Sequence, residues 1–411
     1  MAKTNFLTAK EATRQLGVTP DTLYAYVSRG LIRSETLDAR KRTRRYSADD
    51  VQKLKERKEL RKNPAKIVQN ALHWGTPIME SALTLITEDS LYYRGYDVCW
   101  LAVNRSVEEI AALLWTGSFN SAGELFANPN IDNLFKTDLA RTATSLPLIK
   151  RLSLSLTLAS VNDLAAYDLR PARVAQTGAR ILQRMILSAT DEPKPKTNLA
   201  QMLSATFCPK DSNAQALLNA ALILCADHEL NVSALTARVV ASAEANPYEV
   251  VLASLGAMQG FKHGGGTARV EALFDSIRTT KQIDQVLSDR LRRGESIPGF
   301  GHPLYPKGDP RGRLLFQLIN QNYPKSSGFN LIQTVAERAS KILNTAPTID
   351  FALVALTRVL NLPDGTALAI FAMGRTIGWI GHAIEQYQLG SLIRPRAQYI
   401  GVPPQPIPNE N

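Results

Sequence analysis

Apolar residues recur at intervals of three and four positions along most of the chain beyond residue 65. This spacing is typical of the buried face of a helix, whereas a half-buried strand would alternate at every second residue. A hairpin is predicted around Leu83–Arg94, with Glu88–Ser90 at its turn. Helices are predicted over Ala214–Cys225, Val232–Ala243, Tyr248–Met258, Ile283–Leu291, Leu331–Leu343 and Phe371–Tyr387. The larger part of the chain is therefore predicted to be an all-α domain.

The first 64 residues have a different pattern of short helices. Residues 7–16 and 20–29 each place apolar side chains on one helical face, and Gly17 separates the two predicted helices. The segment Thr8–Glu11 has the form of a capping box at the start of the first helix. A third amphipathic helix is predicted over residues 47–61. Two helices joined by a short turn with glycine predict a helix-turn-helix.

The net charge of +11 is unevenly distributed along the chain. Residues 1–66 contain 17 basic and 8 acidic residues, whereas the following 345 residues contain 31 basic and 29 acidic residues. Much of the excess lies in Arg40–Arg45, just before the third predicted helix. A small basic module, which we end at residue 64, therefore precedes a large and nearly neutral one. Only the small module has the charge that is typical of a polyanion-binding surface.

The cysteines and the lengths of the apolar stretches predict where the protein is located. Its three cysteines, Cys99, Cys208 and Cys225, are widely spaced and odd in number, so no disulfide framework is predicted. The continuous apolar stretches are far shorter than the roughly 18–20 residues that span a bilayer, and the first residues lack the apolar core of a secretory signal. We therefore expect a cytoplasmic protein that does not enter a membrane.

Three interruptions of the helical pattern each contain one of the five histidines of the chain. The stretch around His228 begins like a zinc-protease motif, but Val232 stands where the second histidine would be, so no zinc site is predicted. His263 is followed by three glycines, which let a backbone approach a ligand closely. His302 lies in a loop rich in glycine and proline, the kind of ordered loop in which function concentrates. A glycine-rich helix terminus at His263 and an ordinary surface loop at His302 are the alternatives that each stretch by itself leaves open.

Together these stretches resemble the citrate synthase family. The resemblance runs from about residue 75 to the C-terminus and rests on seven motifs in family order. They are Arg94–Asp97, Asp227–Ser233, Lys262–Gly265, Gly299–Arg311, Ile349–Phe351, Phe371–Trp379 and Ile393–Pro395. The fold that this resemblance implies has a large helical domain, residues 65–264 and 361–411, and a small helical domain, residues 265–360.

The resemblance also implies a reaction and its residues. Asp350 would remove a proton from an acyl-CoA, His263 would donate to the thioester oxygen, and His302 would polarise the ketone of oxaloacetate. The implied ligands of the oxaloacetate carboxylates are His228, Arg311, Arg375 and Arg394, the last contributed by the partner subunit of a homodimer. The implied CoA-binding residues are Ile297, Pro298, Gly299, Phe300, Gly301 and Lys307. The products would be citrate and CoA, and the resemblance implies no metal and no cofactor.

Departures from the family pattern leave undecided which acyl-CoA the enzyme would use. Phe261-Lys262 occupies the places of the family's usual Pro-Leu, and Gly266-Thr267 those of Ala-Asn. Both changes lie on the acyl-CoA side. The sequence is therefore compatible with a citrate synthase that uses acetyl-CoA and with a 2-methylcitrate synthase that uses propionyl-CoA, since one added methylene changes binding by only about 1–3 kcal/mol. A transcriptional regulator with a citrate synthase-like sensor domain is a further alternative.

The N-terminal module resembles the winged helix-turn-helix of the MerR type. The similar residues are Gly17–Leu23, Gly30–Ile32 and Arg45–Val51, and Tyr24 stands where that family usually has an arginine that contacts phosphate. The resemblance implies DNA binding, with backbone contacts from Arg40–Arg45 and base contacts from the second helix. A basic docking domain without a nucleic-acid partner is the alternative.

Overall fold

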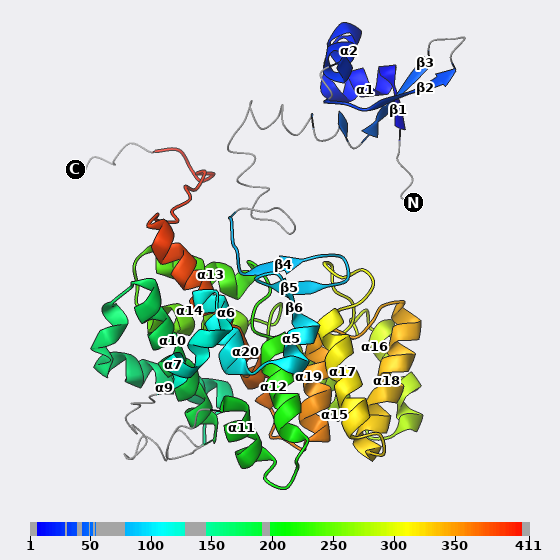
Figure 1. The fold of residues 1–411 in the computed structure, drawn as a ribbon. Helices are drawn as coiled ribbons and strands as arrows, with labels where there is room; N and C mark the ends of the chain where they lie inside the picture. The colour runs from blue at the N-terminus through cyan, green and yellow to red at the C-terminus, as the bar shows by residue number, and fades with distance from the viewer. Residues whose placement is uncertain are drawn as a thin grey trace, which may run out of the picture. The chain divides into compact units, whose positions relative to one another are not determined.

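The computed structural model describes residues 6–28, 31–38, 43–48, 50–51, 54, 79–127, 145–190 and 198–404. The chain divides into two compact units, Met1–Glu80 and Ser81–Asn411 (Figure 1). The boundary predicted at residue 64 lies outside the described residues, as do Arg40–Arg42 and most of the predicted third helix.

The first unit is a winged helix-turn-helix, as predicted. Its elements are β1 (Phe6–Thr8), α1 (Ala9–Leu16), α2 (Pro20–Ser28), β2 (Ser34–Asp38) and β3 (Thr43–Ser47), with the strands in the antiparallel order β1-β3-β2. The predicted capping box is present, because Thr8 and Glu11 bond to each other's backbone amides. Gly17 ends α1 in the left-handed conformation, with a φ of 59°, which explains the need for glycine at the turn. Buried Leu16, Leu23 and Tyr46 join the two helices to the wing.

The second unit begins with a small sheet and is otherwise helical. The predicted hairpin is confirmed as β4 (Thr84–Ile86) and β5 (Leu91–Tyr93), to which β6 (Tyr96–Asp97) adds a third strand. The first group of helical elements is α5 (Val98–Asn104), α6 (Val107–Thr116), η1 (Phe119–Ser121), α7 (Ala122–Phe126), α9 (Leu148–Asn162), η3 (Leu164–Tyr167), α10 (Pro171–Thr190) and α11 (Leu199–Phe207). The second is α12 (Ala214–Leu224), α13 (Val232–Ser242), α14 (Pro247–Met258), α15 (Gly266–Asp275), η4 (Thr280–Gln282), α16 (Ile283–Arg292), α17 (Pro310–Asn322), α18 (Ser327–Leu343), α19 (Ile349–Val359) and α20 (Thr366–Leu389). The predicted fold class is confirmed.

Helix α20 forms the centre of the second unit, in contact with α6, α10, α12, α13, α14 and α19 (Figure 1). Among the described residues it is the one helix that is long and apolar enough to cross a membrane, but 94% of its apolar window is buried inside the protein. Its composition is therefore explained by its place in the core.

Two glycines of α20 allow it to approach the end of α12 closely. A Cβ at Gly374 would lie 2.5 Å from the carbonyl oxygen of Leu222, and one at Gly378 would lie 2.5 Å from that of Ala226. The amide of Gly378 donates to the same Ala226 carbonyl at 2.9 Å. Only glycine permits this backbone contact, which holds α20 against the turn that contains His228.

Candidate active site

The first turns of α13, α15, α17 and α19 converge in the second unit. The hydroxyl of Ser233, in the first turn of α13, lies 2.7 Å from Nε2 of His263, just before α15. Gly266, the first residue of α15, lies against Asp350 in the first turn of α19. The amide of Ile349, which starts α19, donates to Asp309, the N-cap of α17, at 3.1 Å. Helix starts present unpaired amides and positive dipole ends, so this convergence favours a ligand with carboxylates.

His228 and His302 lie edge to face, with ring centroids 5.2 Å apart. Nε2 of His228 is 2.9 Å from the hydroxyl of Tyr305, a residue to which the sequence analysis assigned no role. The amide of Leu304 donates to Nδ1 of His302 at 3.2 Å. Because Nδ1 accepts that hydrogen bond, the neutral ring of His302 has its proton on Nε2.

His263 is oriented by Ser233, which is itself held by two neighbours. The indole Nε1 of Trp379 donates to the Ser233 hydroxyl at 3.1 Å, and Oδ1 of Asn231 accepts from this hydroxyl at 2.8 Å. The single proton of Ser233 thus has two acceptors within reach, Asn231 and Nε2 of His263. When it points to Nε2, His263 has its own proton on Nδ1.

The buried carboxylate of Asp309 pairs with Arg311 and also joins the start of α17 to that of α19. The carboxylate of Asp309 accepts from Nε of Arg311 at 3.0 Å and from Nη2 at 2.9 Å, and it also accepts from the Ile349 amide. Burial would raise the pKa of Asp309, but Arg311 holds it below its ordinary value. Arg311 therefore approaches the histidines with two of its nitrogens bound to Asp309, whose role the sequence analysis did not identify.

Arg375 projects from the middle of α20 and is 1% exposed. Its Nε donates to the carbonyl of Cys225 at 2.8 Å, and its guanidinium lies 5.0 Å from the ring of Phe371. Burial and then the charge of Arg375 lower the pKa of His263, and the same charge contributes at His228. Arg375 thus lies close enough to both His263 and His228 for its charge to act on them.

His382, a core residue of α20, is fully buried. Its Nε2 is 3.3 Å from Oδ1 of Asp227 and its Nδ1 is 3.8 Å from Oε2 of Glu385, but neither contact has hydrogen-bond geometry.

Asp350 combines a buried oxygen atom with a partly exposed side chain. Its Oδ1 has almost no exposed surface and no hydrogen-bond partner among the described residues, whereas Oδ2 accepts from the Thr348 hydroxyl at 3.5 Å. A Cβ at Gly266 would lie 3.3 Å from Oδ1. Burial raises the pKa of Asp350 to about 6. At neutral pH it is therefore ionised but a stronger base than an ordinary carboxylate.

The predicted CoA-binding segment is held against the start of α19. The carbonyl of Gly299 accepts from the Thr348 amide at 2.9 Å, and the amide of Gly301 donates to Ala346 at 3.0 Å. Gly299 has a φ of 84° and leaves no room for a side chain, since a Cβ would lie 2.9 Å from Val270. Ile297 and Pro298 are buried and Phe300 is half-buried, with its ring 5.0 Å from that of Phe351. Lys307 is exposed and lies 3.5 Å from Glu88.

Arg394 is not brought to this cluster by its own chain. It lies exposed beyond α20, beside Ile393, whose amide donates to Ser242 at 3.1 Å. Ser242 is the last residue of α13, whereas Ser233 near His263 is at its beginning. The two ends of this helix are roughly 15 Å apart at 1.5 Å per residue.

The charge states of the cluster follow from burial. Burial and the charge of Arg311 lower the pKa of His302 to about 4, and the pKa of His263 is likewise lowered to about 4. Both histidines are therefore neutral at pH 7, when Asp350 is ionised. The arrangement provides one base and two neutral hydrogen-bond donors, flanked by two arginines. No group of three side chains that could hold a metal is found among the described residues.

Comparisons with known proteins identify relatives of both parts of the chain. The family profile "Citrate synthase, C-terminal domain" matches residues 71–396, and the profile "MerR HTH family regulatory protein" matches residues 7–66. The chain is 29% identical over 353 residues to citrate synthase 2 of Bacillus subtilis, covering 80% of this chain and 94% of that protein. It is 26% identical over 371 residues to a 2-methylcitrate synthase of Shewanella oneidensis, with the same coverage.

Solved structures share the fold of the second unit. The citrate synthase of Thermotoga maritima gives a TM-score of 0.67 at 24% identity, over 81% of this chain and 96% of that one. The citrate synthase of Thermoplasma acidophilum, solved with carboxymethyl coenzyme A and oxaloacetate, gives a TM-score of 0.69 at 23% identity, with the same coverage of the two chains. With its profile match over residues 71–396, this chain belongs to the citrate synthase family of acyltransferases, and a MerR-type helix-turn-helix module precedes the enzyme domain.

Proposed function

We propose that this enzyme condenses acetyl-CoA with oxaloacetate and hydrolyses the resulting citryl thioester to citrate and CoA. The observation that carries the proposal is the grouping of one carboxylate of raised pKa with two neutral histidines at converging helix starts. Asp350 removes a proton from the thioester methyl group, a very weak carbon acid. Its unpartnered Oδ1 supports this role, since no donor among the described residues weakens that oxygen as a base.

His263 and His302 stabilise the two oxygens on which charge develops. With the Ser233 proton directed to Nε2, Nδ1 of His263 donates to the thioester oxygen as the enolate forms. His302 donates from Nε2 to the ketone oxygen of oxaloacetate and protonates the new alkoxide. A neutral donor suits both tasks, because it does not protonate the neighbouring base.

The carboxylates of oxaloacetate bind to His228, Arg311 and Arg375. A planar guanidinium matches a carboxylate in two hydrogen bonds, and the described contacts of Arg375 use its Nε alone. The loop from Ile297 to Gly301 binds the CoA part of the substrate, with Lys307 at a phosphate. The reaction needs no metal or organic cofactor, because side chains supply the base and the donors.

A parallel assay tests the reaction and the acyl group. CoA release is followed with oxaloacetate and either acetyl-CoA or propionyl-CoA. A higher kcat/KM with acetyl-CoA supports citrate synthesis, and a higher value with propionyl-CoA would make the enzyme a 2-methylcitrate synthase. No release from either thioester by the folded protein would overturn the proposed catalysis and favour the sensor alternative.

Activity is expected to fall as the pH is lowered through about 6. Asp350 is the base only when ionised, and its raised pKa of about 6 places the loss there rather than near 4. His263 and His302, with pKa values of about 4, stay neutral over the same range and add no transition near 6.5. The measurement is kcat/KM for the thioester between about pH 5 and 8. An activity that increases toward pH 5 would contradict this assignment.

We further propose that the enzyme works as a homodimer in the cytoplasm. The exposed position of Arg394 supports the dimer, because a partner subunit can supply the arginine that the chain does not bring to its own site. The three unpaired cysteines support a reducing location. Within the enzyme we divide residues 65–264 and 361–411 from a small domain of residues 265–360, whose helices α15 to α19 group together in Figure 1.

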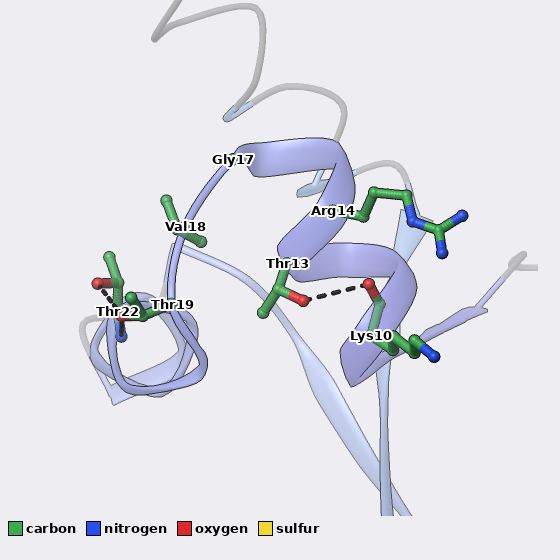
Figure 2. A pocket seen from close by; sticks show the side chains of 7 residues that line it. All are labelled: Lys10, Thr13, Arg14, Gly17, Val18, Thr19 and Thr22. Carbon is green, nitrogen blue, oxygen red and sulfur yellow. Dashed lines mark hydrogen bonds between the residues drawn. The ribbon is translucent and has the colours of Figure 1, made fainter.

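A second function is proposed for residues 1–64, the binding of DNA. Support comes from the winged helix-turn-helix and from a hollow between its two helices, lined by Lys10, Thr13, Arg14, Gly17, Val18, Thr19 and Thr22. Figure 2 shows Lys10 and Arg14 projecting from α1, and the start of α2 with the hydroxyls of Thr19 and Thr22. Both basic side chains are exposed, and phosphate groups are the ligands that such cations and helix starts favour.

Removing the two cations of this hollow is expected to weaken DNA binding. The Lys10→Ala/Arg14→Ala double variant of the full chain should lower affinity for a mixed-sequence duplex and reduce the salt slope by roughly 2, about 0.9 for each phosphate contact. Fluorescence anisotropy at several salt concentrations measures both. Lys150→Ala/Lys341→Ala, which removes two exposed cations of the enzyme, is the matched control. An unchanged slope in the first variant would exclude this face as a DNA contact.

A further inference from the structure

Two exposed side chains lie immediately before His263. Phe261 is 67% exposed, an unusual position for a phenylalanine, and Lys262 is also exposed. The Lys262 ammonium lies 5.9 Å from the centroid of the Phe261 ring. An aromatic face and a cation are therefore presented together, next to a residue to which we assign contact with the thioester.

The segment that presents these two side chains is a closely packed turn. The amides of His263 and Gly265 both donate to the carbonyl of Gly260, at 2.9 and 3.2 Å, so the segment folds into a tight turn. The inner side of the turn has no room for side chains, since a Cβ at Gly264 would lie 2.6 Å from Cγ of Met258 and one at Gly265 2.9 Å from two carbonyl oxygens. Phe261 and Lys262 are exposed on this tight turn.

The same loop is linked to the proposed CoA segment through α15. This helix begins three residues after His263, and Arg269 in it donates to the hydroxyl of Ser296 at 2.6 Å. Val270, the next residue, packs against Gly299. A ligand that extends from His263 to the segment at 297–301 is thus bordered by α15 and by the loop that presents Phe261 and Lys262.

We infer that Phe261 and Lys262 form a binding surface for the non-reacting part of the acyl-CoA. The ring packs on the methylene and amide groups of the pantetheine arm, and the ammonium group pairs with a phosphate of the nucleotide. The chemistry fits both halves, because an aromatic face packs well on methylene groups and the nucleotide carries several negative charges. The inference rests on the proposed condensation reaction.

The proposed contacts of Phe261 and Lys262 can be tested separately with two substrates. Acetyl-CoA contains arm and nucleotide, whereas S-acetylpantetheine contains the arm alone. Phe261→Ala is expected to raise KM about tenfold for both, because the buried area of the arm is lost in either case. Lys262→Ala is expected to raise KM two- to fivefold for acetyl-CoA alone, as for an exposed ion pair, and this effect should shrink with added salt. Neither variant should lower kcat much, since the contacts are the same in ground and transition states.

Matched controls and contrary outcomes are available. Tyr167→Ala removes another ring that is 67% exposed, and Lys281→Ala removes another exposed lysine. If the two test variants leave KM for acetyl-CoA unchanged in an active enzyme, the inference is wrong and the proposed reaction stands. A lowered kcat with unchanged KM would overturn it in favour of a role in positioning His263. A change in subunit mass by sedimentation, without a change in KM, would overturn it in favour of a subunit contact. Absence of turnover in the unaltered enzyme would instead overturn the proposed function.

Discussion

Asp350→Asn is expected to lower kcat by about 10²- to 10⁴-fold, the usual contribution of a general base. Asparagine has nearly the same shape, so the packing of this side chain against Gly266 should be kept. Oxaloacetate binding should also be kept, because Arg311, Arg375 and the histidines remain. CoA release measures the first expectation and titration calorimetry with oxaloacetate the second. Asp350→Ala should likewise abolish turnover and retain oxaloacetate binding.

A matched control and two contrary results define this test. Asp364→Asn changes an exposed carboxylate outside the cluster and should leave kcat unchanged. If Asp350→Asn retains turnover within about tenfold of the unaltered enzyme, the base is another residue. If instead oxaloacetate binding is lost from a folded protein, Asp350 is a substrate ligand and its assignment as the base is wrong.

The same variant also tests whether Arg394 acts across a dimer. Asp350→Asn and Arg394→Ala subunits are each expected to be inactive alone. In a mixed dimer, one site would combine an intact Asp350 with an intact Arg394 of the partner, so random mixing should restore about one quarter of the activity. No recovery in dimers that have exchanged subunits would place Arg394 in its own subunit's site, whereas an active Arg394→Ala homodimer would place it outside both sites.

The second large effect is expected from Gly378→Ala. The added methyl group would lie 2.5 Å from the Ala226 carbonyl oxygen, a backbone atom that cannot rotate away. Overpacking of this kind costs about 1–3 kcal/mol of the free energy of unfolding, and sometimes more. Activity should fall as well, because α20 carries Arg375 and supports the turn that contains His228.

Urea unfolding and CoA release, measured on the same preparations, test both effects. Gly256→Ala is the matched control, since this exposed glycine of α14 has no atom within 4 Å of the added methyl group. It should be neutral or more stable by up to about 1 kcal/mol, as expected for alanine in a helix. Equal stability of the two variants would show that α20 can move away from α12 without cost.

The sequence by itself determined the elements and the candidate side chains. Apolar spacing predicted α12, α13, α14 and α16 to within a residue or so at each end, because helix formation depends on neighbours three and four positions apart. Starts marked by special backbone conformations were less well predicted. Helix α20 begins at Thr366 after the left-handed Gly365, earlier than the apolar pattern indicated. Motif order indicated His263, His302 and Asp350, without showing that they meet.

Only the tertiary structure decided how these residues are held and charged. The hydroxyl beside His263 comes from a residue thirty positions earlier, and Asp309 joins α17 to α19 across forty positions. No local pattern encodes such contacts, because they depend on how packed helices bring distant turns together. Burial, also a property of the packed state, raises the pKa of Asp350 and lowers those of the histidines. The sequence thus indicated the candidate side chains, and packing determined their charge states.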